Sequence, residues 1–185
     1  DAGHGGDEPG TTGPVPGKTE AYFNLEIVLA AKPLLEKLGA NVVLTRTEDV
    51  TFKLSPDRLD FVNKTNPDLC VSVHQNALDY NSDITRVRGT VGLYWQQSGK
   101  LLSRCVSSAV AKALGYYERN VTQQRLAMVR NPKFPSTLVE VSFLTCVEEV
   151  ERLSSGGVEI AAKAIVDGIL EFYRQQEAFI NEYGK

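Results

Sequence analysis

Hydrophobic positions along this chain follow two periods, and segments of one period alternate with segments of the other. Apolar residues recur at helical spacing over 19–39, with Thr19 as the expected N-cap and Gly39 as the expected stop. The same helical pattern predicts helices over 55–64, 99–115 and 157–175. Between them lie short apolar runs at 41–46, 68–74, 89–95, 126–130 and 136–143, each of strand length.

This alternation of helices and strands is typical of an α/β domain. The run 68–74, DLCVSVH, is almost wholly apolar, as expected for a strand that is covered on both faces. The chain opens on a glycine-rich loop, DAGHGGDEPG, and such a loop normally follows a strand. We therefore expect a first strand before Asp1 and a single domain over residues 1–185.

Composition narrows the possible functions. Hydrophobic residues make up 42% and charged residues 23% of the 185 residues, which is ordinary for a globular protein. A net charge of -3 without a basic run predicts no nucleic-acid partner, and no apolar run approaches the roughly 18 residues that indicate membrane insertion. The three cysteines are scattered, so that Cys70 and Cys105 are expected to be small core residues rather than parts of a disulfide framework.

Residues that could bind a metal or act in catalysis lie at or near the predicted strand ends. The only histidines, His4 and His74, lie in the opening loop and at the end of 68–74, while Glu140 lies near the end of 136–143. Glu20 opens the first helix, and all four could converge because ligands bind beyond the carboxyl ends of strands in open α/β sheets.

Each residue also has a simpler explanation. A lone histidine is more often a surface or core residue than a ligand, and Glu20 could simply interact with the helix dipole. Glu140 is harder to explain in this way, since burying an unpartnered carboxylate costs several kcal/mol. Taken together, two histidines and a carboxylate fit a catalytic zinc that keeps a fourth position for water.

Four blocks of the sequence resemble, in order, the signatures of the zinc-dependent N-acetylmuramoyl-L-alanine amidases of the type 3 (cell-wall amidase) family. They are DAGHGGDEPG, the glutamate that precedes NLEIVLA, VSVHQNA and LVEVSFLT. The connecting segments VVLTR, SPDRLDFVNKTNPDLCVSVH and GGVEIAAKAIVDGILEFY are also similar to the family, so that the resemblance covers nearly the whole chain.

The resemblance implies a site and an activity. It assigns His4, Glu20 and His74 as ligands of Zn²⁺ and Glu140 as the catalytic glutamate. The implied fold is α/β, a mixed, mostly parallel twisted sheet of about five to six strands with helices on both faces. The implied substrate is peptidoglycan, cleaved at the amide between the lactyl group of N-acetylmuramic acid and the L-alanine of the stem peptide. Such an enzyme works in the extracellular space or the cell wall, or in the periplasm of a Gram-negative bacterium.

The chain departs from the family pattern at a few positions. Gln75 stands where the family commonly has alanine, and we expect its larger side chain beside the metal. Asp1 is a candidate to orient His4. Some members carry a helical insertion that plugs the site. Here only 78–88 is spare between His74 and Glu140, so we expect an open groove and no autoinhibitory helix.

Two other functions remain open at this point. One is a different zinc hydrolase of cell-wall material, either a stem-peptide peptidase or a sugar deacetylase, because the same water chemistry would serve. The other is a non-catalytic wall-binding module. The intact set of His4, Glu20, His74 and Glu140 favours an enzyme over this module.

Overall fold

The computed structural model describes residues 1–79, 82–83 and 88–183. The helices are α1 (Glu20–Lys37), α2 (Leu59–Thr65), α3 (Gln97–Leu114), α4 (Val147–Arg152) and α5 (Val158–Tyr183). The strands are β1 (Cys70–Asn76), β2 (Val91–Tyr94), β3 (Thr122–Gln123) and β4 (Ser136–Phe143). None of the helices in these ranges is both long and apolar enough to cross a membrane.

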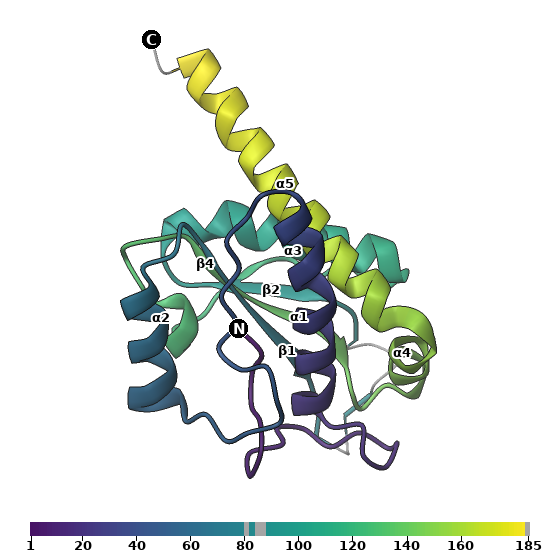
Figure 1. Ribbon diagram of the computed structural model, residues 1–185. Helices are drawn as coiled ribbons and strands as arrows, with labels where there is room; N and C mark the ends of the chain where they lie inside the picture. Colours follow the sequence, from purple (N-terminus) through teal and green to yellow (C-terminus); the bar gives the residue numbers. More distant parts are fainter. Residues whose placement is uncertain (80–81, 84–87, 184–185) are drawn as a thin grey trace.

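The strands form one mixed sheet in the order β1-β4-β2-β3 (Figure 1). The pairs β1–β4 and β2–β3 are parallel, and β2–β4 is antiparallel. Strand β4 has a neighbour on each side and is buried along nearly its whole length, which explains its apolar sequence. The prediction of an α/β fold with a mixed sheet is confirmed.

The predicted number of about five to six strands is wrong, because the described residues form a sheet of four. Residues 41–46 make no ladder with a neighbouring strand. Instead, the hydroxyl of Thr45 accepts a hydrogen bond from the Ala2 N–H at 3.3 Å. Residues 1–3 lie parallel to β1, but only Ala2 forms a bridge, with Val73.

The expected strand at 126–130 is also wrong. Ala127–Val129 form a 3₁₀ turn that lies on one face of the sheet. Val129 packs there against Val91, Leu93 and Leu138, whereas Met128 packs against Cys70 and Phe134. An apolar run can thus be buried flat against a sheet without joining its ladder.

Helices cover both faces of the sheet. Side chains of α1, α3 and α5 share one core with Val73, Val139 and Val141 on the first face. On the other face, Leu59 and Val62 of α2 pack towards Cys70. The C-terminal half of α5 extends beyond the rest of the molecule (Figure 1).

The prediction that Cys70 and Cys105 are core residues is confirmed, since both are free and buried, and Cys146 is free and buried as well. The N-cap of α1 is also as expected, since the hydroxyl of Thr19 accepts a hydrogen bond from the Tyr22 N–H at 3.2 Å. The single domain over 1–185 and the strand before Asp1 stay predictions.

Candidate metal centre

Strand register and the opening loop together bring three of the four candidate residues side by side. His74 of β1 lies opposite Glu140 of β4 in the parallel pair, so that both side chains point to the same face of the sheet. The opening loop reaches them because residues 1–3 run beside β1, where the Gly3 N–H donates to the Val73 carbonyl at 3.1 Å. His4 follows directly after this contact.

Glu20 reaches the same point from the first turn of α1. Its Oε1 lies 2.8 Å from His74 Nδ1 and 3.2 Å from His4 Nε2. One ligand atom from each of these three residues lies within 4.8 Å of the others, a group that could hold a metal ion. Two imidazole nitrogens and one carboxylate oxygen make a donor set that zinc accepts while keeping a fourth position open.

The Glu20 side chain is anchored as well as buried. The Thr11 N–H donates to its Oε2 at 2.9 Å and the Gln75 N–H donates to its Oε1 at 3.2 Å. Burial alone would raise the pKa of Glu20, but hydrogen bonds to His4 and His74, together with their charges, outweigh burial and lower the pKa well below its usual range. Glu20 is therefore held as a carboxylate, the form that binds metal.

Glu140 lies in a different environment from Glu20. Its Oε2 is buried and has no hydrogen-bond partner among the described residues. Burial raises its pKa to about 7, and the charge of Glu20 adds to this, while His74 and His4 act in the opposite direction. An orphaned carboxylate oxygen beside a metal-type donor set fits a group that exchanges a proton during a reaction.

Two glycines leave room for these side chains. A Cβ at Gly3 would collide with the His74 ring, and one at Gly10 would lie 2.5 Å from Glu20 Oε2. Gly10 also has a φ of +67°, in the left-handed region that glycine favours. His4 itself has a φ of +60°, a conformation uncommon for a residue with a side chain.

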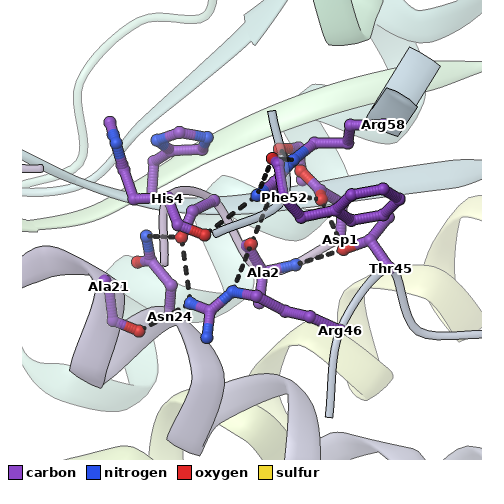
Figure 2. A network of polar contacts seen from close by, with 12 residues as sticks. Asp1, Ala2, His4, Ala21, Asn24, Thr45, Arg46, Phe52 and Arg58 are labelled. Atoms are coloured by element: carbon purple, nitrogen blue, oxygen red, sulfur yellow. Dashed lines mark hydrogen bonds and ion pairs between the residues drawn. The ribbon is translucent and has the colours of Figure 1, made fainter. Parts of the chain in front are cut away.

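Two buried arginines hold the loop that carries His4 (Figure 2). Arg46 donates to the carbonyls of Ala2 and Gly3, both at 3.1 Å, and to that of Ala21 in α1 at 2.7 Å. It thereby ties the loop to the helix that carries Glu20. This role was not predicted, although an arginine at the end of the apolar run VVLTR was a signal for it.

Arg58 completes the support from the other side of the loop (Figure 2). It donates to the Ala2 carbonyl at 2.6 Å, to the His4 carbonyl at 2.9 Å and to Asp1 Oδ1 at 2.8 Å. Asp1 was expected to orient His4, but its carboxylate bonds to Arg58, Thr45 and Ser72, so that it acts on His4 only through Arg58.

The expectation for Gln75 is wrong. Neighbouring residues of a strand point to opposite faces, so that the Gln75 side chain lies away from His74 and is 2% exposed. Its Nε2 donates to Asn24 Oδ1 at 3.2 Å and its Oε1 accepts from the Ser142 hydroxyl at 2.7 Å. Asn24 in turn donates to the Gly3 carbonyl at 3.1 Å. Gln75 thus supports the opening loop through Asn24.

Part of the spare segment 78–88, on which the expectation of an open groove depends, lies outside the described residues, at 80–81 and 84–87. The absence of an autoinhibitory helix stays a prediction.

Comparison with known proteins gives the family. The family model described as N-acetylmuramoyl-L-alanine amidase matches residues 1–171. The N-acetylmuramoyl-L-alanine amidase LytC of Bacillus subtilis is 30% identical over 175 residues, which cover 94% of this chain and 35% of LytC. The probable cell wall amidase LytH of Staphylococcus epidermidis is 26% identical over 94% of this chain and 57% of its own length. The chain thus spans about a third to a little over half of these relatives.

A solved structure agrees with this assignment. The N-acetylmuramoyl-L-alanine amidase AmiC2 of Nostoc punctiforme is 30% identical and superposes with a TM-score of 0.84, covering 94% of each chain. Because the family model matches nearly the whole sequence, the chain belongs to the N-acetylmuramoyl-L-alanine amidase family.

Proposed function

We propose that this chain is a zinc-dependent N-acetylmuramoyl-L-alanine amidase that hydrolyses the amide between the lactyl group of N-acetylmuramic acid and the L-alanine of the peptidoglycan stem. In this proposal His4, Glu20 and His74 hold the zinc, and Glu140 is the catalytic residue. The observation that carries it is the convergence of three ligand atoms within 4.8 Å beside the unpartnered Oε2 of Glu140.

Zinc bound by these residues would supply a Lewis acid and an activated water at neutral pH. The protein's own part is to bring the three ligand atoms together and to keep Glu20 ionised. Both histidines must be neutral to bind metal, and the ionised Glu20 is ready to do so.

In this proposal Glu140 transfers the proton of the attacking water. A carboxyl group with a pKa of about 7 both accepts and releases a proton readily near neutral pH. Its Oε2 would accept the proton of the attacking water and then donate it to the departing alanine nitrogen. Without the second transfer the amine is a poor leaving group. Glu140 would therefore serve both proton transfers in turn.

LytC is named an N-acetylmuramoyl-L-alanine amidase and LytH a probable cell wall amidase, which supports action on cell-wall material. We place the enzyme outside the cytoplasmic membrane, in the extracellular space, the cell wall or the periplasm, where peptidoglycan lies.

Mass spectrometry of purified muropeptides after incubation with the zinc-loaded protein tests the proposal. The expected products are free stem peptides that begin with L-alanine, together with peptide-free glycan. Glu140→Gln should bind zinc but yield no product, whereas His74→Ala should lose zinc, measured by metal analysis after dialysis. Cleavage within the stem, or loss of acetyl groups, would instead identify a peptidase or a deacetylase.

A further inference from the structure

A cavity lies on the same face of the sheet as the candidate metal centre. Val91 of β2 lies opposite Glu140, and its side chain points to the same face. Trp95 comes four positions after Val91 and packs against the same cluster as Val91 and Leu93. At the rise of a β-strand, this places Trp95 about 13 Å from the position of Glu140.

Trp95 lines a cavity of about 560 Å³, a size typical of ligand sites. Its wall carries the cationic side chains of Arg125, Arg130 and Lys133, all exposed. Among the described residues no carboxylate lines the cavity, and none forms an ion pair with these three side chains. The cavity is therefore positively charged and complementary to an anion.

The walls of the cavity are held in place by their own hydrogen bonds. Asn131 Nδ2 donates to Asn63 Oδ1 of α2 at 2.5 Å, and Asn131 Oδ1 accepts from the Lys133 N–H at 2.9 Å. On the other side Gln96 Nε2 donates to the Arg130 carbonyl at 3.2 Å. These bonds connect the segment that carries the cations to α2 and to the end of β2, so the backbone of the cavity is formed in advance.

We propose that this cavity binds the C-terminal carboxylate of the stem peptide, an inference that rests on the proposed amidase function. The two sides of the cleaved amide differ in charge, since the sugar side carries hydroxyl and acetamido groups and the peptide side ends in a carboxylate. An extended peptide advances at most about 3.3–3.6 Å per residue, and it must pass over the buried Val129 of the Ala127–Val129 turn, so that at least about four residues are needed to reach from the metal centre to the cavity. Guanidinium groups bind carboxylates through paired hydrogen bonds, and Trp95 offers an apolar surface to the last side chain.

The test compares two muramoyl tetrapeptides that differ only at the C-terminus, one with a free carboxylate and one with a neutral carboxamide. The wild-type protein should cleave the free acid with a kcat/KM about tenfold higher, mainly through a lower KM. The double variant Arg125→Ala/Lys133→Ala should cleave both substrates with the kcat/KM that the wild type shows for the carboxamide.

Lys112→Ala is the matched control, because it removes an exposed cation from α3, on the opposite face of the sheet. It should retain the full preference for the free acid, and unchanged thermal midpoints should show that all variants are folded. Equal cleavage of the two substrates by the wild type, or an undiminished preference in the double variant, would overturn the inference. Failure of the wild type to cleave either substrate would instead contradict the proposed amidase function.

Discussion

The buried carboxyl group of Glu140 should make the metal-free protein less stable as the pH rises. In the folded protein burial raises the pKa of Glu140 to about 7, whereas an unfolded chain has the ordinary value of 4.5. Between these two values the folded state holds a proton that the unfolded state has released. The contribution of Glu140 to stability is therefore greatest below pH 4.5, falls as the pH rises and levels off above about 7.

The size of this loss follows from the two pKa values. A tenfold change in proton affinity corresponds to about 1.4 kcal/mol, so that the difference between 4.5 and about 7 corresponds to about 3 kcal/mol. Glutamine has nearly the same shape and does not ionise. Glu140→Gln should consequently match the wild type at pH 4.5 and exceed its free energy of unfolding by about 3 kcal/mol at pH 8.

Urea unfolding in the presence of a chelator, repeated from pH 4.5 to pH 8, measures this difference. Titrating groups that do not interact with Glu140 contribute equally to both proteins and cancel in the comparison. Glu151→Gln reports what the loss of an exposed carboxylate does by itself. A difference between Glu140→Gln and the wild type that stays constant over the whole range would refute the argument, because it would mean that Glu140 is not buried as described.

Three further predictions concern the support of the centre. Arg46→Met should lower the free energy of unfolding by about 3 kcal/mol or more, measured in urea, and weaken zinc binding, because three buried carbonyls lose a charged donor. Gln75→Ala should cost about 1–3 kcal/mol in the same assay, since Asn24 Oδ1 and the Ser142 hydroxyl lose their partner. Gly10→Ala should reduce zinc affinity in a competition titration with a chelator, because the new Cβ displaces Glu20. Unchanged affinity would show that the loop can move aside.

Much of the site could be predicted from the sequence because its residues end regular elements. His74 lies near the end of β1, Glu20 opens a capped helix, and Glu140 is the only charged residue of β4. Such positions meet at one edge of an α/β sheet whatever the details of packing. The orientation of Gln75 could also be predicted from the sequence, since neighbouring residues of a strand alternate and Gln75 therefore points to the other face of the sheet from His74.

Other features depended on which segments become neighbours in space. The runs 41–46 and 126–130 have the composition of strands, but a strand forms only where another backbone offers hydrogen bonds, and no local pattern records that partner. The supporting arginines were missed for the same reason: Arg46 and Arg58 are far from His4 in sequence and become buried only when the loop folds over them. Periodicity along a chain determines which side of an element is buried, whereas the tertiary structure decides which other segment it is buried against.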